Sequence, residues 1–111
     1  MAKYIHDITI TRGESLGREI IFETMDLTGL VAKAQVRPAP GSEDLLAEFG
    51  TDIDYGRSAV RLTLTPDQTN AMAPGKHAYD VWLLGGADIR RCYLAGRFIV
   101  LERVTQEENN G

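Results

Sequence analysis

Apolar and polar residues alternate along most of this chain, and a period of two is typical of β-strands rather than of helices. In residues 4–11 the even-numbered positions, which include Ile8 and Ile10, share one face. Residues 31–37 and 57–65 alternate in the same way. Each segment is therefore predicted to be a strand with one face in a core and the other in water.

Turn-forming residues separate these predicted strands. Residues 12–14 and 26–29 are predicted turns on either side of a strand over residues 18–23. Pro38 and Pro40 end the next strand, because proline has no backbone N–H to donate to a sheet.

The strongest hairpin signal lies in the C-terminal third of the chain. Residues 77–84 are predicted to pair with residues 89–95 across the glycine-containing turn 85–88. Gly96 is predicted to mark a bulge, after which residues 98–104 continue as a strand.

One short helix is predicted among the strands. Residues 65–68 (TPDQ) combine a capping box with a proline at the first helical position, so one helical turn is expected to begin there and to end before Pro74. Between residues 38 and 55 the alternation is weak. Residues 45–49 fit a short strand or one helical turn, and we interpret them as a strand.

These elements predict an all-β fold with a single domain over residues 1–104. The predicted architecture is an antiparallel, immunoglobulin-like β-sandwich of about seven strands with one short helical turn near residues 66–72. An up-and-down or OB-like barrel is the alternative. Residues 105–111 are polar and are predicted to form a flexible C-terminal tail.

Composition excludes several classes of protein. The chain has 111 residues, of which 43% are hydrophobic and 25% charged, and these values argue against a disordered, collagen-like or disulfide-stapled chain. The net charge of −4 gives no general reason to bind nucleic acid or an anionic membrane. No apolar run approaches the roughly 18 residues that cross a bilayer, and the N-terminus lacks the apolar region of a secretory signal.

A nucleophilic site would have to use Cys92, the single cysteine, with His77. Pairing Leu84 with Ile89 places Cys92 opposite Val81 and leaves His77 about 13 Å away along the strand, which is too far for a nucleophile and its base. We therefore interpret Cys92 as a small buried hydrophobic residue.

Metal-ligand patterns are weak as well. His6 and Asp7 point to opposite faces of a strand. Asp52 and Asp54 share a face, but they lack the glycine and glutamate of a calcium-binding loop. We predict no metal, no cofactor and no enzymatic activity.

Aromatic and arginine side chains suggest a binding surface instead. Trp82 shares a strand face with Asp80, and we interpret it as a buried tryptophan. The alternative is a carbohydrate-binding module that uses an exposed Trp82 and the neighbouring Tyr79 and Tyr93. Nine of the twelve basic residues are arginines, a composition common in protein–protein contacts. The candidate interface residues are Arg90, Arg91, Tyr93, Arg97 and Arg103, with Leu45, Leu46 and Phe49 from the weakly patterned segment.

Five segments together carry a family resemblance. They are residues 7–14 (DITITRGE), 26–37 (DLTGLVAKAQVR), 60–69 (VRLTLTPDQT), 75–82 (GKHAYDVW) and 94–98 (LAGRF). Their order resembles small β-sandwich proteins of tailed bacteriophages and prophages that occur in tail and baseplate components. It is similar to the N-terminal domain of phage baseplate upper proteins.

This resemblance, over residues 4–104, implies a non-enzymatic virion structural or assembly protein. The implied partners are other copies of the chain, neighbouring phage tail proteins, or both, with no nucleic acid and no membrane. The protein is then expected to be made in the cytoplasm of the bacterial host and incorporated in the virion. Tail, head–tail junction and accessory roles stay open.

Overall fold

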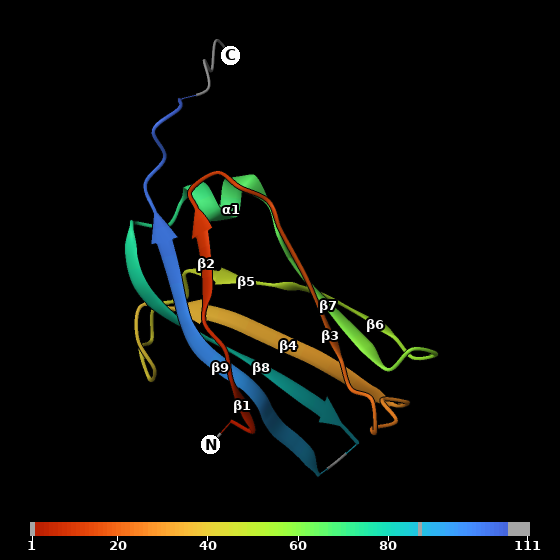
Figure 1. Cartoon of the computed structure of the whole chain (residues 1–111). Coiled ribbons are helices and arrows are strands. Elements are labelled where there is room, and N and C mark those ends of the chain that lie inside the picture. The colour runs from red at the N-terminus through yellow and green to blue at the C-terminus, as the bar shows by residue number, and fades with distance from the viewer. Residues whose placement is uncertain (1, 87, 107–111) are drawn as a thin grey trace.

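Two β-sheets enclose one hydrophobic core in the computed structural model, which describes residues 2–86 and 88–106 (Figure 1). The elements are β1 (Tyr4–Ile5), β2 (Ile8–Thr11), β3 (Leu16–Ile21), β4 (Leu30–Arg37), β5 (Ala47–Glu48), β6 (Gly50–Asp54), β7 (Ala59–Leu64), α1 (Pro66–Asn70), β8 (Gly75–Gly85) and β9 (Ile89–Leu101). The predicted all-β class is confirmed. Of the predicted turn 85–88 and tail 105–111, residues 87 and 107–111 lie outside the described residues.

The larger sheet has the strand order β1-β9-β8-β4-β5, with β2 also paired to β9, and the smaller sheet has the order β3-β7-β6. All pairs between these strands are antiparallel except those of β1 and β2, which run parallel to β9. The chain crosses from the larger to the smaller sheet at Phe49, between β5 and β6. The strand interpretation of residues 45–49 is thus confirmed only for Ala47–Glu48.

On β2 and β4 the core is built from the faces that the alternation predicted. Ile8 and Ile10 of β2 and Ala34 and Val36 of β4 are buried. The fully buried apolar side chains, with no exposed surface, are Leu27, Val36, Val60, Val81, Leu83 and Phe98. Since they come from both sheets and from the turn before β4, one core holds the two sheets together.

The predicted single strand over residues 4–11 is wrong. His6 and Asp7 interrupt it, and Tyr4 and His6 are exposed rather than buried with Ile8. The interruption is held against β9, because the Asp7 carboxylate accepts a hydrogen bond from the backbone N–H of Arg97 at 2.8 Å.

Gly96 does not form the predicted bulge, but pairs in register with Tyr79. A Cβ atom on Gly96 would lie 2.1 Å from the carbonyl oxygen of His6. Glycine is required here because the two backbones approach too closely for any side chain.

The register shift lies instead between Val81 and Trp82, which face Leu94 and Cys92 respectively, so that Tyr93 is the additional residue on β9. The predicted pairing of Cys92 with Val81 is therefore wrong. Nothing in the alternation marks Tyr93, since a bulge of this kind depends on the twist of the finished sheet.

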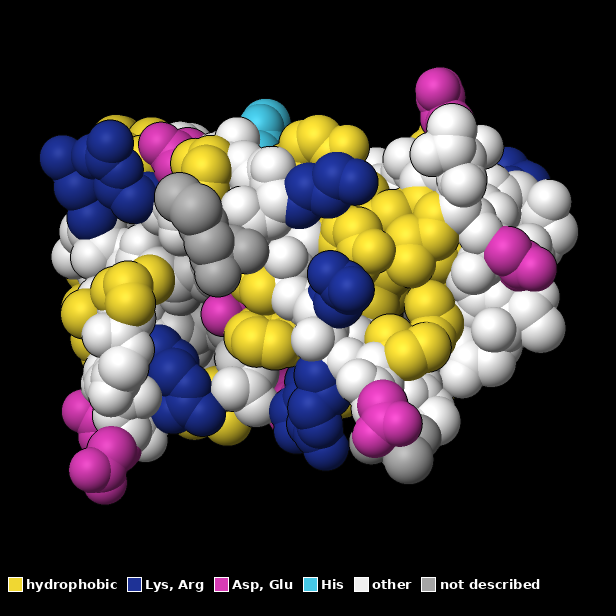
Figure 2. All heavy atoms as spheres, turned by 90° about the horizontal axis from the view of Figure 1, so that it is seen from below, with side chains coloured by type: hydrophobic (Ala, Val, Ile, Leu, Met, Phe, Trp, Pro, Cys, Tyr) yellow, Lys and Arg dark blue, Asp and Glu magenta, His cyan; other side chains and the backbone are white. Residues whose placement is uncertain are grey.

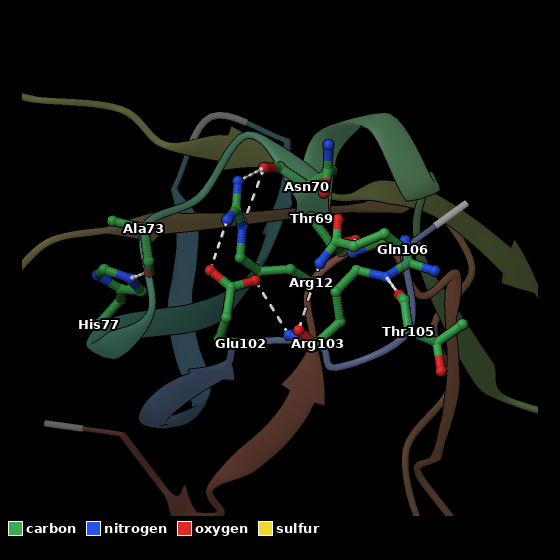
Figure 3. Close-up of polar contacts among 10 residues, drawn as sticks. Arg12, Thr69, Asn70, Ala73, His77, Glu102, Arg103, Thr105 and Gln106 are labelled. Atoms are coloured by element: carbon green, nitrogen blue, oxygen red, sulfur yellow. Dashed lines mark hydrogen bonds and ion pairs between the residues drawn. The ribbon is translucent and has the colours of Figure 1, made fainter. Parts of the chain in front are cut away.

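A polar clamp joins β2, α1 and the end of β9 (Figure 3). The Arg12 guanidinium donates to the carbonyl oxygen of Asn70 at 2.6 Å and to the Glu102 carboxylate at 2.9 Å. The backbone N–H of Arg103 and the Arg12 side chain together lower the pKa of the Glu102 carboxyl.

The predicted capping box of α1 is confirmed, with Thr65 as N-cap. No helix in the described part of the chain is long and apolar enough to cross a membrane.

Tyr79 makes folding sensitive to high pH. Its hydroxyl donates to the carbonyl oxygen of His6, and its side chain is only 3% exposed. Burial, followed by the negative charge of Asp7, raises the pKa of the phenol to about 12 from 10.0. The unfolded chain releases this proton near pH 10 and the folded chain near pH 12, so the stabilisation is complete below pH 10 and is lost as the pH rises to 12.

We expect the free energy of unfolding to fall in this window by up to about 1.4 kcal/mol per pH unit. Tyr79→Phe removes this dependence, which urea unfolding of both proteins at several alkaline pH values measures. Equal pH dependence of the two proteins would contradict the assignment.

Candidate functional site

The outer face of the larger sheet carries a row of side chains from β4, β8 and β9 that point away from the core. Residues directly opposite one another on neighbouring strands share a face. The four sets of neighbours on this face are Val31–Leu84–Arg90, Lys33–Trp82–Cys92, Gln35–Asp80–Ala95 and Arg37–Ala78–Arg97. The bulge at Tyr93 brings Arg90 and Arg97 to the same face, although one has an even number and the other an odd one.

All of these side chains except Val31 and Cys92 line a broad open groove of about 950 Å³. The loop 38–42, which follows β4, closes one end of it, and Ile5 and Asp7 contribute from the side of β1. Seen from the side where β1, β8 and β9 lie, the surface shows hydrophobic side chains gathered between Lys and Arg side chains (Figure 2). Because Ile5, Trp82 and Leu84 line the groove beside Lys and Arg side chains, it offers apolar contact area together with charge.

The groove is basic although the chain is acidic. Its lining includes five of the twelve basic residues (Lys33, Arg37, Lys76, Arg90 and Arg97) and two of the sixteen acidic residues (Asp7 and Asp80). Its formal charge is thus +3, which leaves −7 for the rest of the sequence. Such a separation of charge favours an acidic partner for the groove.

The interpretation of Trp82 as buried is wrong. Its side chain is 37% exposed on the outer face, because the neighbouring positions Val81 and Leu83 take the core face. Tyr79 and Tyr93 do not join it there. Tyr79 is buried, and Tyr93 packs against the core with its ring edge-to-face on Phe22 at 5.5 Å between centroids.

Two of the four candidate arginines line the groove. Arg90 and Arg97 line the groove, and Arg97 also lies 3.6 Å from the Asp7 carboxylate. Arg91 pairs with Leu83 and does not line the groove, but it borders a second hollow together with Trp82 and Arg90. Arg103 follows the far end of β9, where its side chain donates to the carbonyl oxygen of Thr105.

The apolar interface candidates also differ in their exposure to solvent. Leu45 is 48% exposed. Leu46 packs against the core, and Phe49 is 4% exposed between Tyr79 and Phe98. Phe49, a predicted interface residue, is therefore a core residue, because the crossing between the two sheets carries it inward.

Sequence reasoning missed the contribution of β4. Lys33, Gln35 and Arg37 were predicted only as the polar side of a strand. Their alternation with Ala34 and Val36 marks them as outward-facing, but their place beside Trp82 depends on β4 pairing with β8 across more than forty residues of sequence.

Cys92 and His77, the candidate nucleophile and base, lie apart on the larger sheet. Burial, followed by the charge of Asp80, raises the pKa of the Cys92 thiol, which disfavours the nucleophilic thiolate. His77 pairs with Phe98, away from Cys92 on β9, and its Nε2 contacts the carbonyl oxygen of Ala73 at 2.7 Å. No group of three or more His, Cys, Asp or Glu side chains in the described part of the chain is placed to hold a metal ion.

Among known proteins, no family model matches this chain and no curated sequence matches it significantly. Fold and site define an all-β protein whose most distinctive surface is the basic groove with exposed Trp82.

Proposed function

We propose that this chain is a non-enzymatic structural or assembly protein of a tailed-bacteriophage particle. In this role it is a tail or baseplate-associated component that contacts other copies of itself, neighbouring tail proteins, or both. It is made in the cytoplasm of the bacterial host and then built into the virion. The motif resemblance over residues 4–104 supports the phage setting, and the groove supports the mode of action.

The observation that carries the mode of action is the composition of the groove. An exposed tryptophan beside arginines, on a broad face of a sheet, is the combination that contributes most binding energy in protein–protein contacts.

The same proposal includes an immunoglobulin-like sandwich. In such folds one sheet has the strand order G-F-C-C′ and the other B-E-D. The orders β9-β8-β4-β5 and β3-β7-β6 agree with this arrangement when the strands are lettered along the chain. The parallel pairing of β1 and β2 with β9 places the first strands at the G edge.

The test is whether the chain is part of a particle. Prophage induction in the source bacterium, followed by density-gradient purification and mass spectrometry, should find this chain in stoichiometric amounts with tail proteins. Its recovery only in the soluble fraction, while the tail proteins band with the particles, would contradict the proposal.

The exposure of Trp82 favours one second candidate, a carbohydrate-binding module. A sugar ring would stack on this single indole, because Tyr79 and Tyr93 face the core. Titration with neutral and acidic oligosaccharides should then shift the emission of Trp82. If the groove binds protein instead, adding oligosaccharide should leave this emission unchanged.

A further inference from the structure

An apolar strip with positive ends lies across one end of the groove. Val31 and Leu84 are cross-strand neighbours, and Trp82 follows on the same face. Val31 is 57% exposed and Trp82 is 37% exposed. Lys33 lies beside Trp82, with its Nζ 3.9 Å from the exposed Glu48 carboxylate. Arg90 lies beside Leu84 without an ion-pair partner among the described residues. We call these five residues the acceptor strip.

A segment of complementary chemistry lies in the loop after β4. Leu45 is 48% exposed and directly follows Glu43 and Asp44, which are both exposed and form no ion pair with a described residue. We call these three residues the donor loop. The loop is tethered, because the Arg37 side chain donates to the carbonyl oxygen of Ser42 at 3.2 Å.

Within one chain the donor loop lies far from the apolar end of the acceptor strip at Val31. The backbone N–H of Leu46 donates to the carbonyl oxygen of Val36, which holds the donor loop at the C-terminal end of β4. Val31 lies five residues upstream on the same strand, about 17 Å away along its axis. In the single chain, Leu45 and the apolar side chains of Val31 and Trp82 therefore stay exposed. Glu43, Asp44 and Arg90 form no ion pair with a described residue, whereas Lys33 already has the exposed partner Glu48.

We propose that the donor loop of one copy docks on the acceptor strip of a second copy, an inference that rests on the proposed function and names its contact. Leu45 covers the apolar surface around Trp82, and the carboxylates of Glu43 and Asp44 meet Lys33 and Arg90. The opposite charges of the groove and of the rest of the chain favour the same orientation.

The donor loop and the acceptor strip are different surfaces, so two arrangements satisfy the contact. In a two-fold dimer each copy docks its donor loop on the other, and in a head-to-tail arrangement the free acceptor strip of each copy extends the assembly into a ring or a filament. The mass at saturation in the sedimentation experiment distinguishes the two.

Sedimentation velocity over a range of protein concentrations at low salt tests the contact. Lys33→Glu with Arg90→Glu, and separately Glu43→Arg with Asp44→Arg, should each weaken self-association by about tenfold or more. All four substitutions in one chain restore the opposite charges and should bring association back to within about threefold of the original chain. Arg18→Glu is the matched control, because Arg18 is exposed on β3 of the smaller sheet, and it should leave association unchanged.

A chain that is monomeric at every concentration overturns the docking, and so does a four-fold variant that fails to recover while its unfolding transition stays normal. The outcome of the particle experiment does not depend on either result. A monomeric chain that is still found in purified particles would mean that a neighbouring protein occupies the groove, whereas absence from particles would remove the proposed function itself.

Discussion

Gly96→Ala is expected to lower the free energy of unfolding by about 2–4 kcal/mol. The new methyl group overlaps backbone atoms, and these move only if hydrogen bonds break. Its Cβ would lie 2.1 Å from the His6 carbonyl oxygen and 2.7 Å from the His6 carbonyl carbon. The segment between β1 and β2 must then move away from β9. That movement breaks the hydrogen bonds from the Tyr79 hydroxyl to His6 and from the Arg97 N–H to Asp7.

Thermal unfolding measures this effect, and the midpoint should fall by roughly 10 °C or more. The control is Gly56→Ala, because the nearest atom to a Cβ there, the Asp54 Oδ1, is at an ordinary contact distance of 3.6 Å. The control should change stability by less than about 0.5 kcal/mol. Equal, small effects of both substitutions would show that the N-terminal strands do not lie against Gly96.

Phe49→Ala is expected to destabilise the fold by about 3–4 kcal/mol, as large-to-small changes of buried aromatic residues do. The Phe49 ring lies 6.1 Å from that of Tyr79 and 6.0 Å from that of Phe98, centroid to centroid. Its removal leaves a cavity where the chain crosses between the sheets, and the rigid strands on both sides can only partly fill it.

Leu45→Ala, four residues earlier, is the matched control. Because Leu45 is 48% exposed, its truncation should change the free energy of unfolding by less than about 0.5 kcal/mol while weakening self-association. Urea unfolding at low protein concentration separates the two effects. If Phe49→Ala left stability intact and abolished association, Phe49 would be an interface residue after all.

Local signals in the sequence were sufficient for much of the fold. The alternation at Ala34 and Val36 gives the buried face of β4, and the residues Thr65 to Gln68 give the cap of α1. Both depend on neighbours a few residues apart, where spacing and side-chain chemistry decide the structure. The parallel pairing of β1 and β2 with β9 depends instead on contacts about ninety residues apart, which no local pattern encodes.

The candidate site was predictable only in part, for the same reason. Arg90 and Leu45 were recognised as surface residues suited to a contact. Trp82 was assigned to the core, because a tryptophan in an alternating strand fits either face until the pairing is known. The bulge at Tyr93 then decides which arginines of β9 stand beside it. A shift of one residue exchanges the two faces of a strand. A single unrecognised bulge therefore reverses the predicted face of every side chain that follows it on the strand.

Trp82 is the single tryptophan of the chain and lies in the acceptor strip, so its fluorescence reports directly on the proposed contact. The measurement is acrylamide quenching of its emission as the protein concentration is raised at low salt. Docking of a second copy predicts that the emission moves to shorter wavelength and that quenching falls as the chains associate. Emission that stays solvent-exposed and equally quenched, at concentrations where the mass in solution exceeds one chain of 12.3 kDa, would contradict a contact at this face.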